Sequence, residues 1–367
     1  MRSMSDHTHL LEFTAEKRFH QRLVLPAAAD HGPLAVTYAD IGPQTTNGTP
    51  TPTILLIPGM GGSRLWCYHK DYLANKLGVR MLSIDRPGIG GSTPVPVAKR
   101  VTIWLEAVAA VLKHLSIPHV IPLSHSAGTI YILNLLSQRR DLLWPNTPLA
   151  VLMGPWVEPK HSDILSLKMA QMLPKAILHQ YDKLMNLFVK AAPSFSASAA
   201  VFSAMASSIP STRAEGPSRS EACLAGYGMD EEAAKVLDRL AMEYICQEDT
   251  SGFNDEAVIC LKKGPGLWGA CEDLPVYLQG LVQAEERYRE GHPNEQPLKL
   301  KVFFAESDGM IGPKGQKYFE DCFAQADLRG AVCFDSVVEK GTEHDTLWTS
   351  DTGVFEKVLR EIKANLS

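Results

Sequence analysis

The sequence predicts an α/β protein built on a doubly wound, mostly parallel β-sheet. Short apolar runs typical of buried strands alternate with helical patterns over residues 53–155, and the same alternation resumes over residues 298–366. Strands joined by helices pair in parallel through right-handed crossovers. Residues 156–297 show helical patterns only, so we expect a helical segment to be inserted after the sixth strand.

The first part of the α/β domain, residues 1–155, opens with two short β-like runs. These runs cover residues 21–27 and 34–40 and are separated by the turn-forming sequence ADHGP. The next run, TILLI at 53–57, is continuous and rich in β-branched residues, which suits a strand buried on both faces. The elements expected after it are a helix at 64–77, a strand at 80–85, a helix at 101–115, a strand at 119–124, a helix at 127–140 and a strand at 149–155.

The second part of the α/β domain covers residues 298–367, after the inserted segment at 156–297. Its expected elements are a strand at 298–305, a helix at 312–326, a strand at 330–338 and a terminal helix at 352–366. The chain should therefore fold as one α/β domain in two parts, with the helical insertion between them.

Composition narrows the class of partner. The chain of 367 residues has a formal net charge of −5 and no dominant run of Lys or Arg, which argues against nucleic acid and favours a small-molecule substrate. The seven cysteines are widely spaced and include no Cys-x-x-Cys pair, so we expect free thiols and a reducing compartment. We expect neither a metal nor a cofactor. No apolar stretch has the length of a signal peptide core or a membrane span, so we expect a cytoplasmic protein. Its oligomeric state, monomer or homodimer, stays open.

The stretch PLSHSAG, residues 122–128, joins a predicted strand to a predicted helix. A pattern small-x-Ser-x-Gly in this setting is typical of a nucleophile elbow, in which a sharp turn exposes the serine Ser126. The N–H of Ala127, at the positive end of the following helix, is then a candidate oxyanion donor. We interpret Ser124 and His125 as structural or pocket-lining; the alternative for Ser126 is that it only caps the helix.

A nucleophilic serine needs a base, and His344 is the best placed of the twelve histidines. It follows the last predicted strand, on the carboxyl edge of the sheet where Ser126 also lies. For the acid that orients it we favour Asp308, at the end of the strand that follows the insertion, with Glu306 as the alternative. Two further rivals, Glu158 and Asp163, follow the preceding strand.

The chain order Ser126, Asp308, His344 and three further motifs resemble the α/β-hydrolase superfamily. PGMGGS at 58–63 resembles its oxyanion loop, although Pro58 stands where histidine is usual; the resemblance implies that the Met60 N–H is the second oxyanion donor. DRPGIGGS at 85–92 and GTEHDTLW at 341–348 resemble two further conserved turns of the family.

The resemblance covers most of residues 35–155 and 298–365 and also extends to fungal hydrolase-like proteins, some of them associated with secondary metabolism. Haloalkane dehalogenases and epoxide hydrolases of this superfamily use an aspartate at the elbow. Ser126 therefore implies an acyl-enzyme route.

The inserted segment resembles a cap, or lid, over the active site. Caps of this kind leave a mostly apolar pocket, which suits an uncharged, medium-sized ester or thioester. The residues expected to line the pocket are Gly59, Met60, Trp66, His125, Trp156, Met169, Met172, Leu184, Met185 and Phe188.

Three functions stay open at this level. The first is a serine hydrolase that cleaves a carboxylic ester. The second uses the same residues with another acceptor or none, as in an acyltransferase, a cyclising thioesterase or a carbon–carbon bond lyase. The third is a binding protein that keeps the fold without catalysis.

Overall fold

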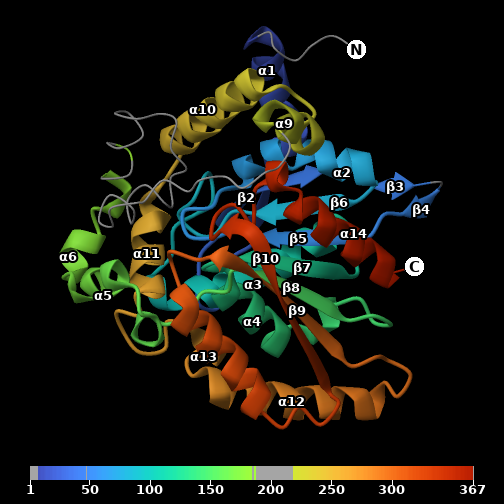
Figure 1. Cartoon of the computed structure of the whole chain (residues 1–367), viewed down its shortest axis with the longest axis vertical. Coiled ribbons are helices and arrows are strands. Elements are labelled where there is room, and N and C mark those ends of the chain that lie inside the picture. Colours follow the sequence, from blue (N-terminus) through green and yellow to red (C-terminus); the bar gives the residue numbers. More distant parts are fainter. Residues whose placement is uncertain (1–6, 47, 184–185, 187–217, 367) are drawn as a thin grey trace.

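The computed structural model describes residues 7–46, 48–183, 186 and 218–366 (Figure 1). In this part of the chain, eight strands form one sheet in the order β1-β2-β6-β5-β7-β8-β9-β10. The strands are β1 (Gln21–Leu25), β2 (Leu34–Ile41), β5 (Thr53–Ile57), β6 (Arg80–Ile84), β7 (Val120–His125), β8 (Leu149–Met153), β9 (Leu298–Ser307) and β10 (Val332–Glu343). Only β2 runs antiparallel to its neighbours among these strands, which confirms the predicted α/β fold with a mostly parallel sheet.

Helices cover both faces of this sheet. α14 packs against α2 on one side, while α3, α4, α12 and α13 pack against one another in a second group. Their bounds are α2 (Asp71–Leu77), α3 (Arg100–His114), α4 (Gly128–Gln138), α12 (Leu274–Gly291), α13 (Gly312–Gln325) and α14 (Val354–Leu366). Because both faces are covered, every residue of the central strands β5, β6, β7 and β8 is buried, as their continuous apolar sequences predicted.

In its described residues, the segment between β8 and β9 contains helices joined by loops and turns, and its only β-type pairing there is a single bridge between Gly90 and Asp249. Besides α12 it contains α5 (Leu165–Met172), α6 (Lys175–Leu178), α9 (Arg219–Tyr227), α10 (Glu231–Gln247) and α11 (Ser251–Cys260). α10 packs on α1 (His7–Thr14), whereas α12 packs on α4 and α13 of the core (Figure 1). The segment thus supplies both an outer layer and one helix of the core flank. None of the helices described is long and apolar enough to cross a membrane.

Three local differences from the expected elements affect the loops around the site. The stretch expected as a helix at 64–77 begins as a 3-10 helix, η2 (Arg64–His69), and becomes α2 only at Asp71. The polar loop before β5 contains a two-stranded ribbon of β3 (Thr45–Thr46) and β4 (Thr49–Pro50). β10 continues past the predicted end at 338 to Glu343, with a register shift after Glu339, so the loop that carries His344 begins at the sheet itself.

Candidate active site

Ser126 occupies a strained turn between β7 and α4. Its φ is +49°, in the left-handed region that costs a non-glycine residue about 1–2 kcal/mol. The Ser126 N–H donates to the carbonyl of Met153 at 3.0 Å, and its own carbonyl accepts from the Thr129 hydroxyl at 2.7 Å. A Cβ at Gly128 would lie 2.3 Å from the carbonyl oxygen of Ile57, so only glycine fits two residues after the serine. The small-x-Ser-x-Gly pattern is therefore explained by close packing of the turn on β5.

The structure brings Ser126, His344 and Asp308 together as one hydrogen-bonded chain. Ser126 Oγ lies 2.8 Å from His344 Nε2, and His344 Nδ1 lies 2.7 Å from Asp308 Oδ2. The other oxygen, Oδ1, accepts from the backbone N–H groups of Met310 and Ile311 at 2.8 and 2.9 Å. Because Asp308 is fixed by its own loop, it holds the His344 ring in one orientation with the proton on Nδ1.

The rival acids have other partners. Glu306 accepts from the Gly341 N–H at 2.8 Å, in the exposed turn of β10. Glu158 pairs with Lys160 and Lys262, at 2.9 Å each. Neither carboxylate contacts the imidazole of the predicted base.

Burial and charge act in opposite directions on the two titratable partners. Burial by itself lowers the pKa of His344, but the charge of Asp308 and the hydrogen bond to it outweigh this effect, and the pKa is raised above 6.5. Burial raises the pKa of Asp308, but the charge and hydrogen bond of His344, helped by the two backbone donors, bring it below its ordinary value. The pair is therefore arranged to stabilise an imidazolium beside a carboxylate, which is the state formed after a serine has lost its proton.

The loop after β5 lies directly against the serine. A Cβ at Gly59 would lie 3.1 Å from Ser126 Cβ, so the glycine permits the close approach. Among the described residues, the N–H groups of Met60 and Ala127 donate to no protein atom. Both are available as donors to an oxygen bound beside Ser126.

A buried ion pair holds this loop in place. Arg86, after β6, donates to the carbonyls of Pro58 and Gly59, and its guanidinium contacts Glu256 of α11 at 2.8 Å. Glu256 in turn accepts from the Gly61 N–H at 3.1 Å. Arg86 and Glu256 are only 1% and 2% exposed. The loop around Met60 is thus fixed on both sides by one core residue and one residue of the inserted segment.

The same Glu256 carboxylate is shared with a second buried cation. Arg100 lies 3.3 Å from it, and the Tyr131 hydroxyl lies 3.4 Å from it and 3.2 Å from Arg100. The guanidinium groups of Arg86 and Arg100 therefore both form ion pairs with the one carboxylate of Glu256. Asp255 is a more distant partner of Arg100, at 3.6 Å.

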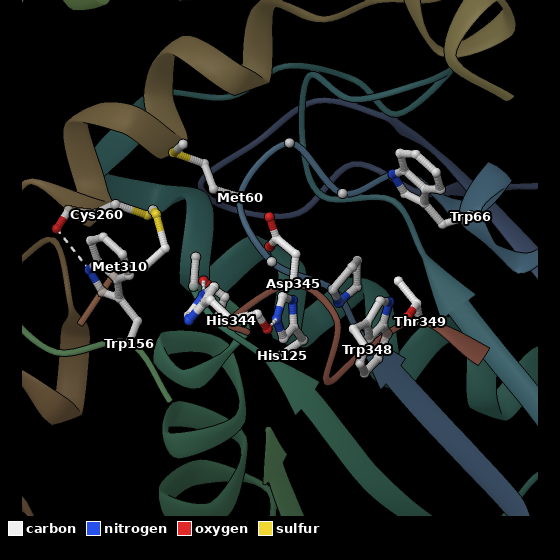
Figure 2. A pocket seen from close by; sticks show the side chains of 16 residues that line it. Met60, Trp66, His125, Trp156, Cys260, Met310, His344, Asp345, Trp348 and Thr349 are labelled. Carbon is white, nitrogen blue, oxygen red and sulfur yellow. Dashed lines mark hydrogen bonds between the residues drawn. The ribbon is translucent and has the colours of Figure 1, made fainter. Parts of the chain in front are cut away.

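A cavity of about 130 Å³ opens over the serine (Figure 2). Of the predicted lining residues, Gly59, Met60, Trp66, His125 and Trp156 line it. The indole of Trp156 is fixed there by a hydrogen bond of 3.0 Å from Nε1 to the carbonyl of Cys260, drawn in Figure 2.

Two other predicted pocket residues lie elsewhere. Met169 and Met172 are 52% and 83% exposed on the outer face of α5 and do not line the cavity. Leu167 and Ala170, and not these two methionines, form the buried face of α5. Leu184, Met185 and Phe188 lie outside the described residues.

Comparison with known proteins decides the family. A sequence model of the alpha/beta hydrolase family matches residues 54–293, well over half of the chain. The chain belongs to the alpha/beta hydrolase family. No curated protein matches it.

Solved structures of this hydrolase's fold include a carboxylesterase of the thaumarchaeon Nitrososphaera gargenis, with 12% identity, a TM-score of 0.51 and coverage of 94% of this chain and 99% of that one. They also include potato (Solanum tuberosum) epoxide hydrolase I, with 15% identity, a TM-score of 0.55 and the same coverage. A third, the epoxide hydrolase of Vigna radiata, has 13% identity and a TM-score of 0.53, and the match covers 95% of this chain and 99% of that one. At these identities the likeness establishes the shared fold alone.

Several residues at the site of this hydrolase were not found by sequence reasoning. They are Cys260, Met310, Asp345, Trp348 and Thr349, all of which line the cavity. Four of them lie within five positions of Asp308 or His344 in the sequence, and this proximity was a usable signal. For Cys260, on α11, no local signal exists because it reaches the cavity only through the packing of the inserted segment.

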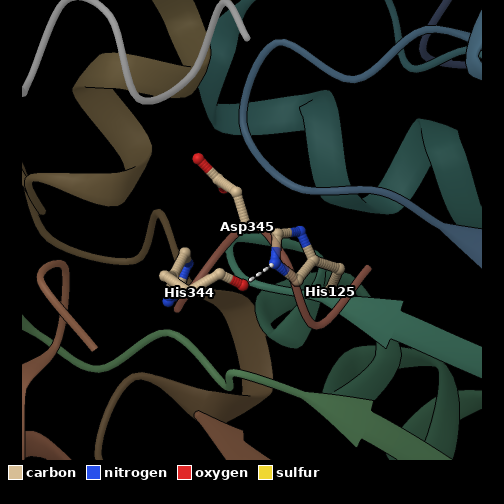
Figure 3. Close-up of side chains that lie close together, drawn as sticks. All are labelled: His125, His344 and Asp345. Carbon is tan, nitrogen blue, oxygen red and sulfur yellow. Dashed lines mark hydrogen bonds between the residues drawn. The ribbon is translucent and has the colours of Figure 1, made fainter. Parts of the chain in front are cut away.

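One group of side chains at the site has the composition of a metal site. His125, His344 and Asp345 each place a potential ligand atom within 4.8 Å of the others (Figure 3). Both ring nitrogens of His344 are already engaged by Ser126 and Asp308, and His125 Nε2 lies 3.0 Å from the His344 carbonyl. Beyond these engaged atoms the group offers at most two ligand atoms, one each from His125 and Asp345, which is fewer than the three or four of a usual protein metal site.

Proposed function

We propose that this alpha/beta hydrolase is a serine hydrolase that cleaves a carboxylic ester or thioester of an uncharged, medium-sized, largely apolar small molecule. The observation that carries the proposal is the continuous chain of short hydrogen bonds, 2.8 and 2.7 Å, from Ser126 through His344 to Asp308. A serine hydroxyl is a weak nucleophile by itself and becomes effective when a neighbouring base removes its proton.

The reaction begins when Ser126 Oγ attacks the carbonyl carbon while His344 Nε2 takes the hydroxyl proton. Asp308 keeps the proton of Nδ1 in place and stabilises the imidazolium that forms. The negative oxygen of the tetrahedral intermediate accepts hydrogen bonds from the Met60 and Ala127 N–H groups. Collapse of the intermediate breaks the ester bond, and His344 returns its proton to the leaving alcohol or thiol.

The acyl group is then bonded to Ser126. Water, deprotonated by His344, attacks it and releases the acid and the free serine. If an alcohol, an amine or a group of the same acyl chain attacks instead, the identical residues perform acyl transfer or cyclisation. A carbon–carbon bond lyase would also use the same triad.

A second candidate, epoxide hydrolysis, comes from the fold neighbours of potato and Vigna radiata. Epoxide hydrolases of the superfamily that this sequence resembles use an aspartate as the nucleophile. Position 126 is a serine, so the alkyl-ester intermediate of that route has no carboxylate on which to form.

The proposal is tested with a fluorophosphonate probe, which reacts only with an activated serine. We expect labelling of the wild-type chain at Ser126, none in Ser126→Ala and a large loss in His344→Ala. Equal labelling of the His344 variant would remove the base from the mechanism. No labelling of the wild type would favour a binding protein without catalysis.

A further inference from the structure

His125, the residue before Ser126, presents a hydrogen-bond acceptor to the cavity. Its Nε2 lies 3.0 Å from the backbone carbonyl of His344, which can only accept, so the ring proton is on Nε2 and Nδ1 carries a lone pair. His125 is 5% exposed and lines the cavity. Among the described residues, no hydrogen bond engages its Nδ1.

This acceptor lies close to the reacting serine. A Cβ at Gly59 would be 3.1 Å from His125 Nδ1 and also 3.1 Å from Ser126 Cβ. The two atoms are therefore at most twice that distance apart. A group two or three bonds from a carbonyl carbon held at Ser126 can reach Nδ1.

The imidazole of His125 stays neutral at any ordinary pH. Burial, with a smaller effect of the neighbouring His344, lowers the pKa of His125 to about 3. The ring therefore does not become a second donor to the substrate as the pH changes. Its stacking on Trp348, with ring centroids 5.5 Å apart, further fixes its plane.

A carboxylate lies near the His125 ring. An Asp345 oxygen lies within 4.8 Å of a His125 ring nitrogen, and Asp345 lines the same cavity (Figure 3). Among the described residues that line the cavity there is no Lys or Arg. In the view of Figure 2, three lining residues that carry hydrogen-bond donors, Trp66, Trp348 and Thr349, lie on the opposite side of His125 from His344.

We propose, building on the proposed function, that the preferred substrate carries a hydroxyl group two or three bonds from the ester carbonyl, which donates to His125 Nδ1 beside the Asp345 carboxylate. A lone pair and a negative charge at one place favour a donor and disfavour an anion. The substrate class is thus a hydroxyacyl ester, and an ester with a carboxylate at the corresponding position is a poor substrate.

The expected ratio of kcat/KM between the hydroxyl ester and an isostere without the hydroxyl follows from the hydrogen bond that the isostere cannot make. A methyl group in the place of the hydroxyl would desolvate His125 Nδ1 without giving it a hydrogen-bond partner. We expect a preference of about tenfold or more in kcat/KM, because one unpaired buried acceptor costs enough to reduce a rate by at least that factor.

The test compares three 4-nitrophenyl esters of similar size. These are the 3-hydroxybutanoate, the isosteric 3-methylbutanoate and the monoester of succinate, each corrected for its own reactivity toward hydroxide. We expect kcat/KM to be highest for the 3-hydroxybutanoate, at least tenfold lower for the 3-methylbutanoate and lowest for the succinate. If deacylation limits turnover, the rate constant of the 4-nitrophenolate burst should follow the same order among the three esters.

Two variants assign the effect to the two residues. In His125→Gln, the amide N–H takes the place of the Nε2 donor while the Nδ1 acceptor is lost, so the ratio of hydroxyl to methyl ester should fall toward one. In Asp345→Asn, the ratio of succinate to methyl ester should rise about tenfold. Retained ratios in both variants would overturn the assignment.

The result for the wild type separates this inference from the proposed function. If the 3-methylbutanoate is cleaved as fast as the hydroxyl ester, the substrate class is wrong while the serine hydrolase stands. If no ester acylates the protein and the fluorophosphonate does not label Ser126, the proposed function fails and the substrate class fails with it.

Discussion

Replacing Glu256 by glutamine tests whether the inserted segment controls the proposed oxyanion loop, residues 58–63. The carboxylate accepts from the Gly61 N–H and faces the guanidinium groups of Arg86 and Arg100, and these three charged side chains are no more than 2% exposed. Glutamine keeps an acceptor oxygen but removes the charge. Breaking a buried pair in this way costs about 3–5 kcal/mol of the free energy of unfolding.

The catalytic effect should be separate from the loss of stability. Complete loss of one oxyanion donor reduces kcat by about 10²–10³. In Glu256→Gln the two contacts of Arg86 to the loop carbonyls remain, so we expect a partial displacement of Met60 and a decrease in kcat of about 10- to 100-fold. KM for a simple ester should change little, because the Met60 N–H would stabilise mainly the negative oxygen of the transition state.

Asp255→Asn is the matched control. It removes a carboxylate next to Glu256 that faces Arg100 at 3.6 Å but does not contact the loop. The assays are urea unfolding, kcat at a temperature where both variants are folded, and affinity for a trifluoromethyl ketone, which mimics the tetrahedral intermediate. Affinity for the ketone should fall with kcat in Glu256→Gln only. An unchanged kcat in a folded Glu256→Gln protein, or an equal loss in the control, would refute the reasoning.

Three further predictions concern the triad and the elbow. Asp308→Asn should lower kcat for ester hydrolysis by about 10⁴-fold because the His344 tautomer is no longer fixed. Glu306→Gln should keep nearly full activity in the same assay. If Glu306→Gln loses activity and Asp308→Asn keeps it, Glu306 is the acid. Because protonated His344 cannot accept a proton and its pKa is raised, kcat/KM should fall as the pH decreases through a value above 6.5, and a pH profile without that decrease would exclude His344 as the base. Gly128→Ala places a Cβ 2.3 Å from a backbone carbonyl oxygen and should lower the free energy of unfolding by about 3 kcal/mol or more. Gly280→Ala, in an open helical position, should raise it by about 0.5–1 kcal/mol. Urea unfolding curves that shift in the same direction and by the same amount for both variants would contradict the packing of the elbow.

Local patterns predicted the sheet and the three residues of the hydrogen-bonded chain. Continuous β-branched runs require burial on both faces, so the central strands could be located without knowledge of their partners. The carboxyl ends of parallel strands share one edge of a sheet, and this rule alone placed Ser126, Asp308 and His344 near one another.

What escaped prediction depends on packing between segments distant in sequence. The pairing of Arg86 with Glu256 joins residues that only the fold brings together, and neither position is distinctive in sequence. The apolar stripe of α5 indicated a helix correctly but gave no sign that Met169 and Met172 face solvent. The acceptor role of His125 depends on its contact with a backbone carbonyl, which no sequence pattern encodes.

The most direct measurement is the mass of the intact protein during turnover of a 4-nitrophenyl ester. After rapid acid quenching, we expect one added acyl group, mapped to Ser126 by peptide analysis and missing in Ser126→Ala. Release of 4-nitrophenolate with no bound acyl group in either protein, at the same rate in the Ser126 variant, would contradict covalent catalysis by this serine.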